Sequence, residues 1–129
     1  MSTLGDMVTL TLAGESHGPA ITAILSGLPA GVRVKEAFIE MQLRRRRGIS
    51  AAATARQEPD DFEILSGVFN GCTTGTPITI TIYNEDADSS GYNASKVRPG
   101  HADYTAFYKY HGYQDFRGGG HFSGRISAA

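Results

Sequence analysis

The sequence predicts a mixed α+β fold, in which several short strands are accompanied by a smaller number of helices. Two observations lead to this prediction. Several stretches either alternate between apolar and polar side chains or are rich in apolar β-branched residues, and both patterns are typical of strands. Lys35–Arg47 instead carries apolar residues near one helical stripe and is followed by Gly48, the residue at which helices commonly end.

The predicted strands are separated by turn residues. In the first stretch Val8, Leu10 and Leu12 alternate with two threonines, which predicts a strand with one polar face. Proline and glycine in Leu28–Gly31 and Thr73–Pro77 predict turns. The predicted strands are Met7–Leu12, Ala20–Leu25, Phe62–Phe69 and Ile78–Tyr83.

Helices are predicted in two places besides the chain end. In the Lys35–Arg47 helix, Ala37, Phe38 and Met41 fall near one stripe, which predicts the apolar face of that helix. Tyr104–Tyr110 is expected to form a short aromatic helix. The long polar segment Asn84–Gly100 and the glycine-rich segment Gly112–Gly120 are predicted to be loops.

Composition bounds the class of protein. With 129 residues the chain has the size of one domain, and its 40% hydrophobic and 19% charged residues indicate a globular protein. A net charge of -1 argues against a nucleic-acid-binding surface. Cys72 is the only cysteine, which excludes a disulfide framework and a cysteine-based metal site. No pair of histidines or acids has the spacing of metal ligands, so no metal site is predicted.

The residues at the two ends of the chain lead to one expectation each, about cellular location and about chain length. Met1–Asp6 lacks the basic region and long apolar run of a signal peptide, and no apolar run approaches the length that spans a membrane. We therefore expect a cytoplasmic protein with no membrane partner. The chain stops at Ala129, about one turn after a helix begins at Ser123. Because so short a helix does not offset its nucleation cost, we expect a fragment of a longer protein.

Two histidines lie in polar, glycine-framed segments. His17 is in Gly14–Gly18, and His101 is in Arg98–Tyr104. Histidine exchanges protons near neutral pH, so it can act as an acid or a base under cellular conditions. With several arginines in the chain, these histidines suggest acid chemistry on an anionic substrate. The simpler interpretation of the first segment is a glycine turn with a solvated histidine.

Two arginine-rich segments are candidate anion sites. One or two cations in Arg44–Arg47 would suit the negative end of a helix dipole, but four in a row direct at least one guanidinium inward or toward a ligand. In Arg117–Arg125, three glycines allow close approach of the backbone to an anion, and Ser123 is positioned to cap a helix. This segment differs from the dinucleotide-binding fingerprint, and a flexible linker is its alternative interpretation.

Two other functions fit parts of this pattern. Gly14–Gly18 matches G-x-S-x-G, so Ser16 could be the nucleophile of a serine hydrolase with Asp103 and either His111 or His121 as partners. That motif requires a helix after the serine, whereas a strand is predicted here. The second alternative is a non-catalytic anion-binding module, which would be formed by Arg45, Arg125 and the Gly118–Gly120 loop.

Taken together, these segments resemble the N-terminal part of the chorismate synthases. The resemblance covers almost the whole chain, with the segments in order and sensibly spaced. Members of that family are well over twice as long, so residues 1–129 are expected to be the N-terminal part of a single truncated domain. The segments are Gly14–Gly18, the arginine run ending at Gly48, Ile64–Phe69 with Thr73–Pro77, Arg98–Tyr104 and Asp115–Arg125.

The resemblance implies a β-α-β sandwich of antiparallel sheets and helices, incomplete in this chain, and a homotetramer for the full-length protein. It implies a lyase of the shikimate pathway that eliminates phosphate in the anti sense from enolpyruvylshikimate phosphate to give chorismate. Reduced FMN is required although no net redox change occurs, and NADPH is a possible reductant of the flavin. The implied site residues are His17 as acid toward the departing phosphate, His101 as the group that protonates or steadies the reduced flavin, Ser16, Arg45 and Arg125 at the substrate, and Arg45, His121, Phe122 and Ser123 at the flavin.

The chain departs from the family pattern at a few positions. Arg47 stands where proline is common, and His121 and Phe122 replace an arginine and a serine of many relatives. Ala51 occupies a position where many relatives carry a basic residue. The alanine removes one possible contact to an anion, which weakens the expectation of a pyridine-nucleotide site.

Overall fold

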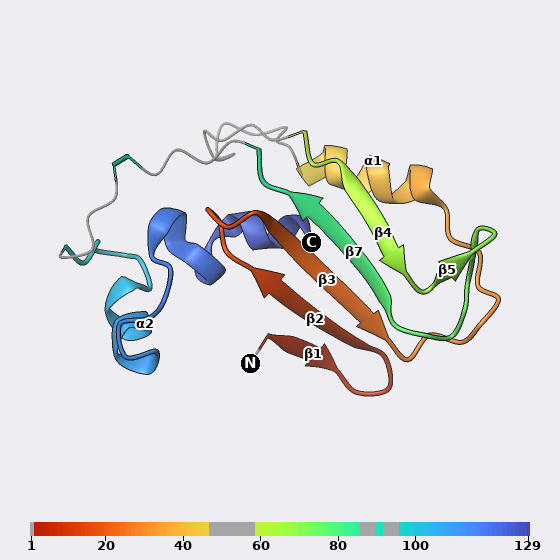
Figure 1. Ribbon diagram of the computed structural model, residues 1–129, viewed down its shortest axis with the longest axis horizontal. Coiled ribbons are helices and arrows are strands. Elements are labelled where there is room, and N and C mark those ends of the chain that lie inside the picture. Colours follow the sequence, from red (N-terminus) through yellow and green to blue (C-terminus); the bar gives the residue numbers. More distant parts are fainter. Residues whose placement is uncertain (1, 47–58, 86–89, 92–95) are drawn as a thin grey trace.

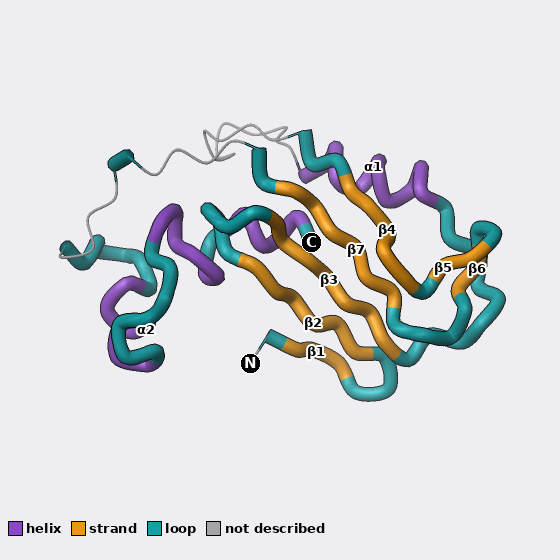
Figure 2. The backbone as a smooth tube through the Cα atoms, viewed as in Figure 1, coloured by secondary structure: helices purple, strands orange, loops and turns teal. Residues whose placement is uncertain are grey.

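The computed structural model describes residues 2–46, 59–85, 90–91 and 96–129. Its main element is a five-stranded antiparallel sheet with the strand order β1-β2-β3-β7-β4, beside a two-stranded hairpin of β5 and β6. Figures 1 and 2 show this sheet as the centre of the molecule. The strands are β1 Thr3–Gly5, β2 Thr9–Gly14, β3 Ala20–Ser26, β4 Phe62–Ser66, β5 Val68–Phe69, β6 Cys72–Thr73 and β7 Ile78–Tyr83, and the helices are α1 Glu36–Arg46, α2 Asp103–Lys109, and the 3-10 helices η1 Arg117–Phe122 and η2 Gly124–Ala128.

The register of the sheet separates an apolar face from a hydroxyl-rich face. Ile21 of β3 pairs with Ile82 of β7, which in turn pairs with Phe62 of β4, so apolar side chains line up across the strands. One residue further along, Thr22 pairs with Thr81, and their hydroxyl oxygens are 3.2 Å apart. Because side chains alternate along a strand, this register places the two sets on opposite faces.

The core lies between the apolar face of the sheet and helices from two distant parts of the chain. Ile21 and Ile82 are 0% and 1% exposed, and they form one cluster with Leu43 of α1 and with Ile126 and Ala128 of η2. Figure 1 shows α2 beyond the end of the sheet, away from α1. The predicted α+β class is confirmed. Among the described residues, no helix combines the length and the apolar character needed to cross a membrane.

The predicted apolar face of α1 is wrong. Phe38 and Met41 are 56% and 47% exposed, whereas Leu43 is buried and Ile39 packs against the core. The helix carries apolar residues over more than one arc, so its sequence alone does not select the inward arc. The arc of Ile39 and Leu43 faces inward, where it packs against the core, and Arg46, one turn further along, binds Asp60 beside the sheet.

Several element boundaries also differ from the prediction. The strand predicted at Phe62–Phe69 is divided at Gly67, where φ is +80° and a Cβ atom would lie 2.6 Å from the carbonyl oxygen of Pro77. β1 was not predicted, and it forms because the segment before β2 turns back to pair Thr3 with Thr11. The helices predicted near Tyr104 and after Ser123 are present, the latter as a 3-10 helix. The predicted helix end at Gly48 and the departures at Arg47 and Ala51 lie outside the described residues.

Candidate functional site

Two glycine-rich segments, far apart in the sequence, meet at one end of the sheet. β2 ends at Gly14, and the turn that leads into β3 contains Ser16 and His17. The backbone N–H of Ser16 donates to the carbonyl oxygen of Gly120 at 3.0 Å. His121 Nδ1 lies 2.9 Å from the carbonyl oxygen of Gly14. A carbonyl oxygen only accepts, so Nδ1 carries the proton and His121 is the donor.

The glycine loop lies directly against the side chains of Ser16 and His17. Gly118, Gly119 and Gly120 have φ values of +59°, +88° and +57°, which side-chain-bearing L-residues rarely adopt. A Cβ atom on Gly118 would lie 2.6 Å from Nε2 of His17 and 2.7 Å from Oγ of Ser16. Contact this close is possible only because residue 118 has no side chain.

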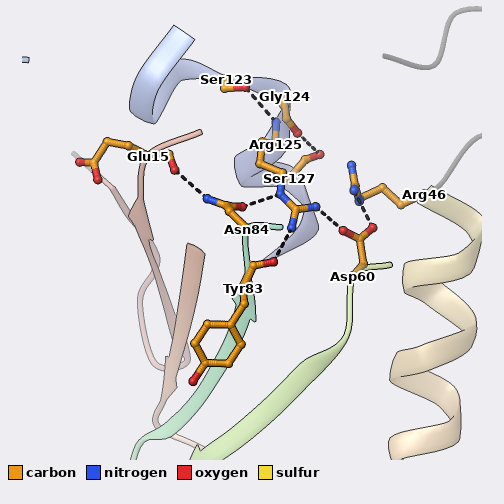
Figure 3. Close-up of polar contacts among 9 residues, drawn as sticks. All are labelled: Glu15, Arg46, Asp60, Tyr83, Asn84, Ser123, Gly124, Arg125 and Ser127. Atoms are coloured by element: carbon orange, nitrogen blue, oxygen red, sulfur yellow. Dashed lines mark hydrogen bonds and ion pairs between the residues drawn. The ribbon is translucent and has the colours of Figure 1, made fainter. Parts of the chain in front are cut away.

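Asn84 holds the turn that carries Ser16 and His17. It follows β7, and its Nδ2 donates to the carbonyl oxygens of Glu15 at 3.1 Å and Gly18 at 2.8 Å. Its Oδ1 accepts a hydrogen bond of 2.8 Å from Nε of Arg125 (Figure 3). The amide therefore joins the backbone of the turn to the side chain of Arg125.

Arg125 is buried in a network of charged and polar groups. The residue is 5% exposed, and its guanidinium also donates to the carboxylate of Asp60 and to the carbonyl oxygen of Tyr83 (Figure 3). Asp60 is 2% exposed, and its carboxylate forms a second ion pair with the guanidinium of Arg46, with a nitrogen-oxygen distance of 2.6 Å. Buried ions must be paired to remain charged, and here one carboxylate faces two guanidinium groups.

His101 is exposed and lies just before α2, in a loop closed by an ion pair. The guanidinium of Arg98 binds the carboxylate of Asp103 in a bidentate manner, at 2.8 Å and 2.9 Å. These hydrogen bonds hold the pKa of Asp103 below its usual range. Arg98 also donates to the carbonyl oxygen of Phe116 at 2.9 Å, just before the glycine loop. Arg98 therefore connects the His101 loop to the segment that contacts His17.

A second ion pair lies beside the glycine loop. The side chain of Arg117 binds the carboxylate of Asp115, with nitrogen-oxygen distances of 2.8 Å. The hydrogen bond from Arg117 lowers the pKa of Asp115, and the charge of His17 contributes in the same direction. Asp115 is therefore an anion within electrostatic reach of His17.

A groove opens next to the two joined segments. It has a volume of about 490 Å³ and adjoins a smaller one of about 270 Å³. The rings of Tyr110 and Phe122 line both, with centroids 6.2 Å apart. His121 also lines both, whereas Ser123 accepts a hydrogen bond from the backbone N–H of Arg125 as the predicted helix cap. The aromatic walls and the imidazole suit a planar ligand with polar edges.

The family model for chorismate synthase matches residues 8–129 of the chain. The chain belongs to the chorismate synthase family. Over 125 residues it is 52% identical to a chorismate synthase of Thermococcus gammatolerans. The matched region covers 95% of the chain and 35% of the relative. A chorismate synthase of a Sulfurovum species is 54% identical over 132 residues, covering 100% of the chain and 37% of the relative.

A solved structure described as a crystal structure of chorismate synthase has the same arrangement. The TM-score is 0.64 at 33% sequence identity, over 95% of this chain and 30% of that chain. The resemblance inferred from the sequence is therefore confirmed. The chain spans only about a third of the length of these chorismate synthases, as the 35% and 37% coverages show.

The structure brings some of the expected site residues of this chorismate synthase family member together and leaves others apart. Ser16, His17 and His121 meet at the junction of the two segments, and Phe122 lines the adjoining groove. Arg45 is on the exposed side of α1, where it donates to Gln42 at 3.0 Å. No hydrogen bond or ion pair described for residues 2–46, 59–85, 90–91 and 96–129 joins Arg45 or His101 to that junction. These site assignments stay predictions.

The hydrolase alternative is wrong. The turn after Ser16 leads into strand β3, whereas a nucleophile elbow requires a helix there. Asp103 is bound by Arg98, and the two ring nitrogens of His121 contact the Gly14 carbonyl oxygen and the Ser2 hydroxyl. The non-catalytic anion-binding module is also disfavoured, because the chain belongs to a family of enzymes.

The sequence analysis missed the residues that hold the site together. Asp60 and Asn84 each flank a strand, and no periodicity distinguishes them from ordinary loop residues. For Arg98 and Asp103 a signal existed, since opposite charges flank the Pro99–Gly100 turn at a spacing that a loop can close.

Proposed function

We propose that the full-length protein containing this chain eliminates phosphate in the anti sense from enolpyruvylshikimate phosphate to form chorismate. Membership of the chorismate synthase family supports this proposal, and one structural observation carries it. The glycine-framed His17 lies where two separate segments meet, packed against Gly118. Such a placement holds the imidazole in a fixed position between the two segments.

The proposed role of His17 follows from the chemistry of the leaving group. Phosphate departs more easily when its developing charge is neutralised, and a protonated imidazole can donate that proton. The carboxylate of Asp115 interacts electrostatically with His17. Ser16, which is 3% exposed, is proposed to help bind the substrate beside His17.

Arg45 and Arg125 are proposed to bind the anionic substrate. Arg45 is exposed and available for this role in the described structure. Arg125 donates to Asp60, Asn84 and Tyr83 and is 5% exposed, so direct contact with the substrate requires its side chain to become accessible. In the structure Arg125 binds Asn84, and Asn84 in turn holds the turn that carries His17.

Reduced FMN is the proposed cofactor, and the groove fits it in chemical character. Tyr110 and Phe122 offer flat surfaces for an isoalloxazine ring, and His121 offers a polar edge. Ser123 lies beside them at the start of η2. When bound, reduced FMN supplies electron density to the reaction without net oxidation of the substrate. The residues proposed to contact it are His121, Phe122 and Ser123 with Arg45, and His101 is proposed to protonate or steady the reduced flavin.

Assembly, cellular location and chain boundaries are proposed on the basis of the family. We propose a homotetramer and a cytoplasmic location for the full-length protein, with NADPH as a possible flavin reductant. We also propose that residues 1–129 are the N-terminal part of one domain. The 35% share of the relatives' length supports this last point.

The test is His17→Ala in the full-length protein, assayed for phosphate release with reduced FMN under anaerobic conditions. Turnover should fall by two to four orders of magnitude, about the contribution of a general acid, while FMN affinity is retained. His111→Asn is the matched control, since His111 is exposed and asparagine tolerates its φ of +54°. Near-normal turnover of His17→Ala would exclude the proposed acid role.

A further inference from the structure

We propose that Gly118 is a positioning residue that sets the place of the His17 imidazole by having no side chain. The kinetic part of this inference rests on the proposed function, because it takes His17 to be the acid. The geometric part does not, since it concerns only the contact between the glycine loop and the turn after β2.

The contact is tighter than any other residue type would permit. The Cδ2–Nε2 edge of His17 faces Gly118, and a Cβ atom there would lie 2.6 Å from both ring atoms. The same Cβ would lie 2.7 Å from Oγ of Ser16. Real Cβ atoms essentially never come within 3.0 Å of such neighbours, so something must move if residue 118 carries a side chain.

The backbone on both sides of the contact is fixed. Ser16 N–H donates to Gly120, and Nδ1 of His121 donates to the carbonyl oxygen of Gly14. Gly120 is itself held against the carbonyl oxygen of Asp115, where a Cβ atom would overlap. Because neither segment can withdraw without breaking these bonds, an added methyl group at residue 118 displaces the imidazole rather than the loop.

Gly119 provides a control that is matched in backbone strain. Its φ of +88° is at least as unfavourable for alanine as the +59° of Gly118. A Cβ atom on Gly119 would meet only Cβ of Ser123, at an ordinary contact distance of 3.5 Å. Gly119→Ala therefore imposes the strain of an L-residue in this loop without touching His17.

The geometric experiment is NMR spectroscopy of the 129-residue chain with labelled histidine. The wild type should show a strong nuclear Overhauser effect between an α proton of Gly118 and Hδ2 of His17. Gly118→Ala should shift the His17 ring resonances, whereas those of His101 and His111 stay in place. Gly119→Ala should leave the His17 resonances close to their wild-type positions. Absence of the wild-type Overhauser effect, or equal His17 shifts in both variants, would overturn the proposal.

The kinetic experiment uses the same two substitutions in the full-length protein. Gly118→Ala should lower kcat on the order of 10²-fold with little change in KM, since small displacements of a catalytic group have effects of that size. Gly119→Ala should cost much less. In a His17→Ala background the two glycine variants should have equal, small effects, because the group that Gly118→Ala displaces is gone. A full Gly118→Ala effect in that background means that the substitution acts through Ser16 or through folding and not through His17, which refutes positioning of the imidazole.

The two experiments separate the two proposals. If the Overhauser effect and the His17 shifts appear as expected but kcat is unchanged in both Gly118→Ala and His17→Ala, the positioning holds and the acid role of His17 fails. If His17→Ala abolishes turnover while Gly118→Ala leaves the His17 resonances and kcat unchanged, the acid role holds and the positioning fails.

Discussion

Asp60 and Arg125, which are 65 positions apart in the sequence, form a buried ion pair that joins the segment just before β4 to the helix η2. Both side chains are at most 4% exposed. Asp60 also binds Arg46 at the end of α1, and Arg125 reaches the turn of His17 through Asn84. One carboxylate therefore connects α1, the sheet, the C-terminal helix and the candidate site.

Removing the charge of Asp60 should strongly destabilise the fold. Asp60→Ala leaves two arginines without their shared acceptor, and breaking a buried pair typically costs about 3–5 kcal/mol. Urea unfolding followed by circular dichroism measures the change. Asp61→Asn is the control, because Asp61 is the exposed neighbour and should change stability by less than about 0.5 kcal/mol. Equal losses in both variants would contradict the role assigned to Asp60.

The face of α1 that packs on the sheet can be tested by paired truncations. Leu43→Ala removes a 7% exposed side chain from the core and should destabilise by about 2–4 kcal/mol. Met41→Ala, two positions earlier and 47% exposed, should cost less than about 1 kcal/mol. Chemical denaturation of both variants compares the two faces. A larger loss for Met41→Ala would restore the face that the sequence pattern predicted.

The Arg98–Asp103 ion pair should make stability depend on acid pH. The pKa of Asp103 is lowered in the folded state, so the unfolded state binds a proton first as the pH falls. The contribution of the pair to the free energy of unfolding is therefore complete above the pKa that Asp103 has in the unfolded chain. This contribution is lost as the pH falls through the lower pKa that Asp103 has in the folded protein. Unfolding free energy measured from pH 6 downward should decline less steeply in Asp103→Asn than in wild type.

Asp6→Asn is the control for that titration, since Asp6 is an exposed carboxylate in the turn between β1 and β2. Its pH profile should follow that of the wild type. An Asp103→Asn profile with an unchanged slope would show that the ion pair does not contribute to acid sensitivity.

The 129-residue chain alone should bind FMN weakly and should not turn over substrate. The groove beside His121 is open to solvent, and its two aromatic walls cover only part of a flavin. Tight cofactor sites bury most of the ligand surface, which requires walls on several sides. Titration of FMN followed by flavin fluorescence, then an anaerobic assay of phosphate release, tests this directly. Micromolar affinity with measurable turnover would place a complete site within this chain.

The sequence by itself determined the local elements and the family. Alternation and β-branched runs located β3 and β7, because the strand period is visible in a few residues. The aromatic run before Tyr110 formed α2, and Ser123 capped η2 as expected, since capping depends on adjacent backbone. The glycine-framed motifs identified the chorismate synthase family, and family membership was then confirmed over residues 8–129.

Only the tertiary structure decided which side chains meet. Which arc of α1 faces inward depends on how the helix docks against the sheet. Phe38 and Leu43 are both apolar, so the sequence alone does not show which of them is buried. The Asp60–Arg125 pair and the contact of Gly118 with His17 join residues that have no local signal for one another. Such contacts form when strands pair and helices pack, so their partners are set by the register and layering of the whole sheet rather than by neighbouring sequence.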